Sequence, residues 1–193
     1  MSVIRAKGFD ATTVDDLCAA AEVTKGAYFH HFKTKEALGV AAADYWSETT
    51  GARFASAPYH MHADPLDRVL AYLDFRREII GGDISKWTCL VGTMAQEVYL
   101  THPAVRDACA ASISDHAGTL EPDIAAAMKA RGIEEASWTA QSLARHTQAV
   151  LQGAFILAKA FGEADLARAS IDHLRRYIEL LFGVPQSHRG GVE

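Results

Sequence analysis

Apolar residues recur at intervals of three and four along most of this chain, which is the period of an amphipathic α-helix. The stripes are clearest in residues 66–80, 90–98, 143–161 and 171–181. No stretch shows the strict alternation of apolar and polar residues that is typical of β-strands. The pattern therefore predicts an all-α fold.

Capping residues, glycines and prolines divide the pattern into separate helices. After a short first helix that ends near Phe9, we expect helices at about 14–21, 25–32, 35–54, 65–80, 88–100, 103–131, 135–161 and 163–182. Pro122 should kink or break the helix that contains it, because proline lacks an N–H and clashes one turn back. Gly153 costs about 1 kcal/mol relative to alanine inside a helix, which a close helix crossing would explain.

The stretch from Thr12 to Lys35 predicts two short helices joined by a tight turn. Thr12 and Thr13 suit the N-cap of the first helix, Thr24 suits that of the second, and Thr34 suits that of the helix that follows. Asp15 and Asp16 in the first turn complement the helix dipole. Glu22 falls in the turn, and a left-handed conformation there would cost glutamate about 1–2 kcal/mol. This is a helix-turn-helix arrangement, whose second helix can enter a DNA major groove.

The second of these helices combines a cation, a glycine and four consecutive ring-bearing residues. Against DNA, rings contact sugars and thymine methyls, while Lys and His donate to phosphates or guanine. A packed helix pair with a few solvated cations is the alternative. On the first interpretation, the expected DNA-binding residues are Thr13, Thr24, Lys25, Gly26, Tyr28, Phe29, His30, His31 and Lys35.

Residues 7–38, KGFDATTVDDLCAAAEVTKGAYFHHFKTKEAL, resemble the DNA-binding domain of the tetracycline-repressor (TetR/AcrR) family of transcriptional regulators. The matching positions include Gly8-Phe9, Thr12-Thr13-Val14, Val23-Thr24-Lys25-Gly26, Phe29, His31-Phe32, Lys35-Glu36 and Leu38. The resemblance implies a helix-turn-helix DNA-binding domain at 1–46 (motif about 14–33) and a larger helical ligand-binding and dimerisation domain at 47–185. Residues 186–193 are expected to be a disordered tail.

The resemblance also carries details of individual positions. In the family, the N-terminus of the helix that starts at Lys35 faces a phosphate, and some members bury the position of Tyr28. The family often has Gly where this chain has Glu22, and its first helix normally begins further upstream. Either the true chain start lies before Met1 or this protein functions with a shorter helix.

Charge and cysteine usage narrow the functional classes. The net charge is −5, and residues 1–38 contain five Lys/Arg against five Asp/Glu, so DNA affinity must come from local placement of cations and from pairing two subunits. Three widely spaced cysteines form neither a disulfide framework nor a zinc motif, which indicates a reducing compartment. Without a signal peptide or long apolar run, we expect a cytoplasmic protein with no membrane contact.

The last two helices, at about 135–182, carry apolar stripes broader than one small domain needs. Packing into their own core would explain part of this width. Together with the resemblance, the pattern favours a homodimer in which these helices form a four-helix bundle.

Candidate chemistry elsewhere is sparse. Six residues could line an effector pocket between helices, or could simply belong to the ordinary core. They are Trp87, Met94, Glu97, His116, His146 and Phe155. The loop 60–64 holds His60, His62 and Asp64, which leaves a metal site as an alternative. Cys89 and Cys109 are either redox sensors or inert core residues. No catalytic or phosphate-binding motif is present, so we expect neither an enzyme nor a cofactor.

The leading hypothesis is a homodimeric repressor that a small, largely apolar ligand releases from a palindromic operator in double-stranded DNA. Two alternatives stay open at this point. One is an all-helical metal-binding or enzymatic bundle, and the other is a helical adaptor that has lost DNA binding.

Overall fold

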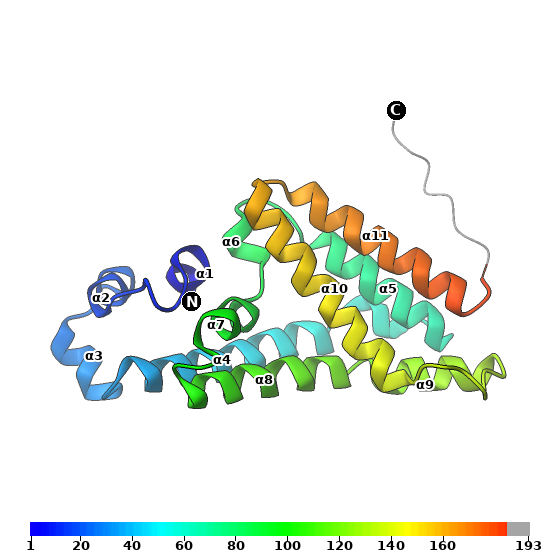
Figure 1. The fold of residues 1–193 in the computed structure, drawn as a ribbon, viewed down its shortest axis with the longest axis horizontal. Helices are drawn as coiled ribbons and strands as arrows, with labels where there is room; N and C mark the ends of the chain where they lie inside the picture. Colours follow the sequence, from blue (N-terminus) through cyan, green and yellow to red (C-terminus); the bar gives the residue numbers. More distant parts are fainter. Residues whose placement is uncertain (185–193) are drawn as a thin grey trace. The chain divides into compact units, whose positions relative to one another are not determined.

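The computed structural model describes residues 1–184 and confirms the all-α fold, because these residues form helices and no strand. The predicted disordered tail at 186–193 lies outside the described residues. The elements are labelled in Figure 1: α1 (Ser2–Lys7), α2 (Val14–Ala21), α3 (Lys25–His31), α4 (Lys35–Ala55), η1 (Pro58–Met61), α5 (Pro65–Glu78), α6 (Ile84–Trp87), α7 (Leu90–Val98), α8 (Pro103–Gly118), α9 (Glu121–Ala130), α10 (Ala140–Phe161) and α11 (Ala164–Leu181).

Two helix starts differ from the sequence prediction because polar caps set them. α10 begins at Ala140 rather than near 135, since the Thr139 hydroxyl accepts a hydrogen bond from the Ser142 amide (3.1 Å) and the Ser142 hydroxyl accepts one from the Thr139 amide (2.9 Å). The short α6 was not predicted between the helices expected at 65–80 and 88–100, and it starts where the Asp83 carboxylate accepts a hydrogen bond from the Ser85 amide (2.8 Å). The break expected around Pro122 is confirmed, because α8 ends at Gly118 and α9 begins at Glu121.

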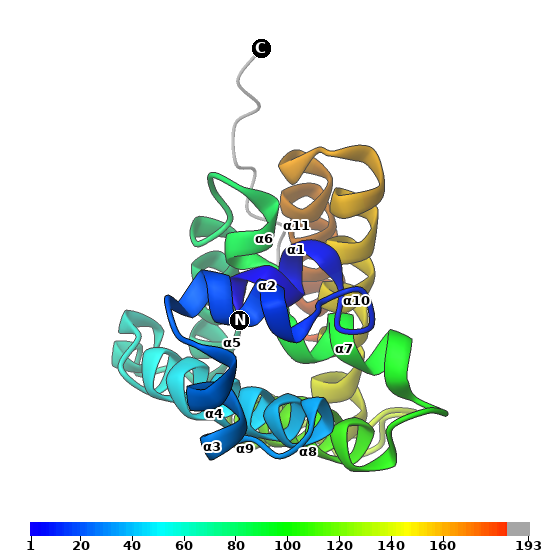
Figure 2. The ribbon, with the colours of Figure 1, turned by 90° about the vertical axis from the view of Figure 1, so that its left-hand side faces the viewer.

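The first of two compact units comprises residues 1–57 and 81–119. Within it, α8 packs against both α4 and α7, and α1 contacts α2, α6 and α7. Figure 2 shows α2 and α3 joined by their turn, with α3 leading into α4. The buried core joins the N-terminal helices to α7 and α8 and consists of Ile4, Phe9, Ala43, Leu90, Val91, Met94, Val98, Val105 and Cys109.

Among the described residues, the second unit contains 58–80 and 120–184, with α5, α9, α10 and α11 packed together. α10 and α11 run side by side (Figure 1). The apolar stripe predicted in α5 is buried. Partly buried ion pairs also join the helices of this unit, among them Arg68 of α5 with Asp123 of α9 (2.7 Å). The helix crossing expected at Gly153 is not found among the described residues, because a Cβ there would meet no atom within 4 Å. Across residues 1–184, no helix has both the length and the apolar character to span a membrane.

Candidate nucleic-acid interface

The first helix of the predicted motif, α2, starts on a complete capping box. The Thr13 hydroxyl accepts from the Asp16 amide (3.1 Å), and the Asp16 carboxylate accepts from the Thr13 amide (2.9 Å). Lys7 lies 2.8 Å from the same carboxylate. This lysine first, and then the Thr13 donors, lower the pKa of Asp16 from 3.8 to about 2. At neutral pH the start of α2 is therefore fixed by an ionised cap.

The turn between α2 and α3 has the left-handed conformation whose cost for glutamate was considered in the sequence analysis. Glu22 has φ 55° and ψ 39°, and it is the one non-glycine residue with positive φ in residues 1–184. The Val23 amide donates to the Cys18 carbonyl (3.0 Å), and the Glu22 amide to the Ala19 carbonyl (3.4 Å). This pair of bonds is the Schellman closure of a helix C-terminus, which normally uses glycine. The geometry sets the angle between the two helices at the cost of strain at Glu22.

The second helix of the motif, α3, presents a lysine and aromatic rings on its outer face. The Thr24 hydroxyl caps it by accepting from the Ala27 amide (3.2 Å). Lys25 and His30 are exposed, and the Phe29 side chain is 46% exposed. His31 is exposed as well, but it also lines the hollow behind α3 that is described below. This face therefore offers N–H donors and an aromatic ring to an approaching surface.

Two other features of the start of α3 bear on approach by a ligand. A Cβ added at Gly26 would come no nearer than 3.7 Å to any neighbour, so packing inside the chain does not require glycine there. Lys25 Nζ pairs with Asp15 at 2.7 Å, and both side chains are largely exposed. Such a surface pair is weak, which leaves Lys25 able to exchange its partner for a phosphate. Sequence reasoning missed Asp15 as this partner, because the two lie ten positions apart across the turn.

Tyr28 does not fit the predicted contact set. Its side chain is only 5% exposed, and its ring packs edge-on to Phe29 (centroids 5.1 Å apart) and against Phe32 (5.9 Å). Burial raises the pKa of the Tyr28 hydroxyl. This residue supports α3 from inside, so direct contact of its ring with DNA is not available in this conformation.

Lys35 is also held within the same unit. Its Nζ donates to the Asp10 carbonyl (3.0 Å) and lies 4.7 Å from the centroid of the Phe9 ring. Thr34 caps α4 by accepting from the Ala37 amide (3.0 Å). The remaining amides of the first turn can still face an anion, as the N-terminus of a helix favours.

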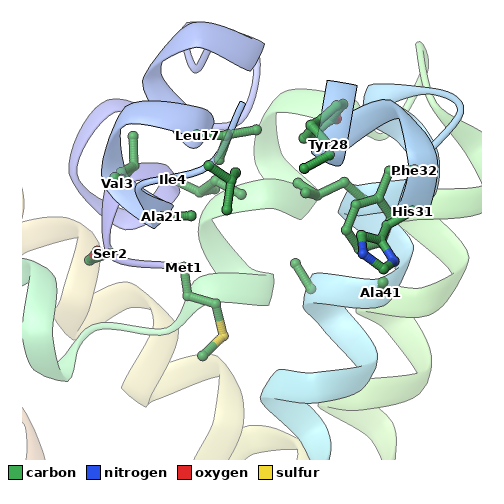
Figure 3. A pocket seen from close by; sticks show the side chains of 15 residues that line it. Met1, Ser2, Val3, Ile4, Leu17, Ala21, Tyr28, His31, Phe32 and Ala41 are labelled. Carbon is green, nitrogen blue, oxygen red and sulfur yellow. The ribbon is translucent and has the colours of Figure 1, made fainter. Parts of the chain in front are cut away.

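A hollow of about 470 Å³ lies behind α3. Figure 3 shows Ile4 and Leu17 on one side of it, with Tyr28 and Phe32 opposite and Met1 at its edge. The lining is mostly apolar and includes several alanines from α2, α3 and α4. The inner face of α3 therefore lies partly over open space and lacks the dispersion contacts of a filled core.

The six residues predicted for an effector pocket fall into both compact units. Trp87, Met94, Glu97 and His116 belong to the first unit, and His146 and Phe155 to the second. Met94 is a fully buried core residue, Glu97 accepts a hydrogen bond from the Asp10 amide, and the His116 ring lies edge-on to Phe54. In the second unit, exposed His146 contacts Tyr177, and buried Phe155 contacts Arg76. A role for these residues in ligand binding stays a prediction.

In the loop 60–64, which was considered as a metal site, the Asp64 carboxylate contacts other parts of the protein. Asp64 caps α5 through the amides of Leu66 (2.7 Å) and Asp67 (3.3 Å) and pairs with Arg131 (3.2 Å). Among residues 1–184, no three His, Cys, Asp or Glu side chains are grouped so that they could hold a metal ion. The metal-binding alternative therefore has no support from the described residues.

Two capped helices, a closed left-handed turn and an exposed second helix define a helix-turn-helix protein of the DNA-binding class. The profile of the family "Bacterial regulatory proteins, tetR family" matches residues 1–42, and that of "Tetracyclin repressor-like, C-terminal domain" matches residues 65–174, more than half of the chain. The chain therefore belongs to the tetracycline-repressor family.

Individual relatives agree with this assignment. The chain is 28% identical over 100 residues to the HTH-type transcriptional repressor DhaR of Mycobacterium sp. (strain GP1), covering 52% of this chain and 48% of that protein. It is 33% identical over 66 residues to the HTH-type transcriptional repressor NemR of Escherichia coli (strain K12), covering 34% of this chain and 33% of NemR. The matches thus span less than half the length of these curated relatives.

The structural likeness extends further along the chain. The crystal structure of a TetR transcriptional regulator from Chloroflexus aurantiacus J-10-FL superimposes with a TM-score of 0.75 and 28% identity, covering 92% of this chain and 88% of that chain.

Proposed function

We propose that this protein is a DNA-binding transcriptional repressor, and not an enzyme, that acts in the cytoplasm as a homodimer on a palindromic operator. A small, largely apolar ligand releases it. The observation that carries the proposal is the exposed face of α3 with Lys25, Phe29 and His30, in a pair of capped helices. Residues 1–46 form the DNA-binding domain and residues 47–185 the ligand-binding and dimerisation domain. The names of DhaR and NemR as repressors support the same activity.

Specific roles follow from exposure and capping. The proposed DNA contacts are Thr13, Thr24, Lys25, Gly26, Phe29, His30, His31 and, near a phosphate, Lys35. Lys25 and the histidines donate to phosphates or base edges, and Phe29 contacts a sugar or thymine methyl. Helix-turn-helix dimers place two such helices in major grooves about 34–36 Å apart.

The test is salt-dependent binding of the full chain to the DNA that flanks its own coding region. We expect specific binding that weakens steeply with salt, and a smaller salt slope in Lys25→Ala, because each lost phosphate contact reduces the slope by roughly one. Lys129→Ala, which removes an exposed lysine from α9, is the matched control and should bind like the wild type. A folded dimer that binds no DNA specifically at low salt would overturn the proposal and favour the adaptor alternative.

The proposed homodimer uses the outer faces of α10 and α11. Apolar side chains on these helices remain exposed in the described chain: Ile156, Leu157, Phe161 (66%), Tyr177 and Leu180 (62%). Gly153 lies one turn before Leu157 on the same helix, with open space where a Cβ would be. An apolar surface of this kind next to a small residue suits a close crossing by helices of a second copy.

Leu180→Glu tests this surface by placing a charge in the proposed interface. We expect analytical ultracentrifugation to show a monomer for Leu180→Glu and a dimer for the wild type. Met61→Glu is the control, because Met61 is even more exposed (87%) but lies on η1, away from α10 and α11 in sequence. A dimer that persists in Leu180→Glu with unchanged affinity would contradict this interface.

A further inference from the structure

The backbone of Asp10, in the loop between α1 and α2, is held through both its N–H and its carbonyl by side chains from other helices. The Asp10 amide donates to Glu97 Oε2 (2.9 Å), and the Asp10 carbonyl accepts from Lys35 Nζ (3.0 Å). Both bonds involve an ionised side chain, and bonds of this kind are shorter and stronger than neutral ones. An acid on α7 and a base on α4 therefore fix the position of one loop residue.

Glu97 also lies directly against Gly8, the residue that ends α1. Gly8 has φ 88°, and a Cβ added there would stand 2.3 Å from Glu97 Oε1. The positive φ favours glycine at this position, and any side chain there would have to displace the Glu97 carboxylate. The Gly8 carbonyl in turn accepts from the hydroxyl of buried Thr12 (2.5 Å), and the next residue, Thr13, caps α2. A continuous set of contacts therefore runs from Glu97 to the start of the helix-turn-helix.

The loop between these contacts is anchored by Phe9, which is fully buried. Its ring packs edge-on to His102 (5.6 Å), which directly precedes α8. A Cβ at Gly39 of α4 would come 2.8 Å from the same ring. Because close-packed side chains have little freedom to move independently, these contacts hold the loop against α4 and the start of α8.

We propose that Glu97 is a positioning residue for DNA binding. It joins α7, inside the region matched by the C-terminal profile, to the loop that orients α2 and α3, inside the region matched by the N-terminal profile. A displacement of α7 is transmitted through this contact to the recognition helix. The inference rests on the proposed function.

The two variants Glu97→Ala and Glu97→Gln separate positioning from charge repulsion. Glutamine retains an oxygen that accepts from the Asp10 amide, so we expect Glu97→Gln to bind DNA as tightly as the wild type or more tightly. Alanine loses the acceptor, and we expect about tenfold weaker binding, equivalent to about 1.4 kcal/mol. If Glu97 merely repelled DNA, both variants would bind more tightly, and that result would overturn the inference. Gln96→Ala, the adjacent exposed position on α7, is the control and should match the wild type.

Amide hydrogen exchange in the full chain gives a readout that does not need DNA. We expect the Asp10 amide to exchange at least tenfold faster in Glu97→Ala, with the amides of α10 and α11 unchanged, which also shows that the variant is folded. Unchanged Asp10 exchange overturns the inference whatever the DNA result. If the wild-type protein binds no DNA, the proposed function is overturned, and the role of Glu97 in DNA binding is overturned with it. That holds even if the exchange rate of the Asp10 amide still depends on Glu97.

Discussion

Glu22 offers a direct test of the turn that sets the recognition helix. Its backbone is left-handed (φ 55°), and the Schellman bonds of α2 require that conformation. The perturbation is Glu22→Gly, with Glu22→Asn and Glu22→Gln as comparisons. Glycine adopts this conformation freely, asparagine adopts it with little cost, and glutamine has the same backbone restriction as glutamate.

The expected gain follows from two opposing terms. The left-handed conformation costs a non-glycine residue about 1–2 kcal/mol, whereas glycine loses about 0.4–1 kcal/mol through the larger entropy of the unfolded chain. The net stabilisation in Glu22→Gly is then roughly 0.5–1 kcal/mol, or a Tm increase of about 1–4 °C for a chain of this size. Glu22→Asn should gain a similar amount, and Glu22→Gln should gain nothing.

Urea unfolding and amide exchange of Val23 together measure this effect. Val23 is the right reporter because its amide donates to the Cys18 carbonyl, the bond that closes α2. We expect slower Val23 exchange in Glu22→Gly and Glu22→Asn and no change in Glu22→Gln. DNA affinity separates charge from strain, since all three variants remove the same negative charge. If Glu22→Gly lowered the free energy of unfolding, or if Glu22→Gln stabilised equally, the strain argument would be refuted.

Three further predictions concern titratable groups. The pKa of Asp16 (about 2) lies below its ordinary value of 3.8, so its carboxylate stabilises α2 above about pH 4, and this contribution disappears as the pH falls toward 2; an NMR titration midpoint near 4 would contradict it. Burial raises the pKa of the Cys109 thiol to about 12, so iodoacetamide at pH 8 should leave Cys109 unmodified until the protein is unfolded, as mass spectrometry can check. Asp15→Asn frees Lys25 and should tighten DNA binding a few-fold at low salt, a gain that should be lost in the Lys25→Ala background.

Much of the fold could be predicted because the signals are local. Thr13, Thr24 and Thr34 were recognised as caps from their own neighbourhoods, and each accepts the expected backbone hydrogen bond. The three-and-four spacing also located the buried faces of α5 and α7, since a helix buries residues in a fixed order along its sequence. Thr139 was missed, although Thr followed by Ser three positions later is a capping pattern of the same kind.

The contacts that shape the candidate site join residues far apart in the sequence, and the spacing of residues along the chain carries no information about them. Lys35 contacts Asp10 across 25 positions, and Glu97 contacts it across 87. Tyr28 likewise occupies a helix position that spacing alone could assign to either face, and packing against Phe32 decides it. Such contacts depend on how separate helices come together, which propensities and motifs do not encode.

The first compact unit is built from two separated stretches of chain, residues 1–57 and 81–119. During synthesis, the core around Ile4 and Phe9 therefore cannot form until Leu90, Met94 and Val105 have emerged from the ribosome. The same arrangement limits protein engineering. A fragment that stops at residue 57 would expose apolar side chains that normally pack on α7 and α8. A chimaera that borrows this recognition helix for another regulator must carry residues 81–119 with it, or rebuild the surface they supply.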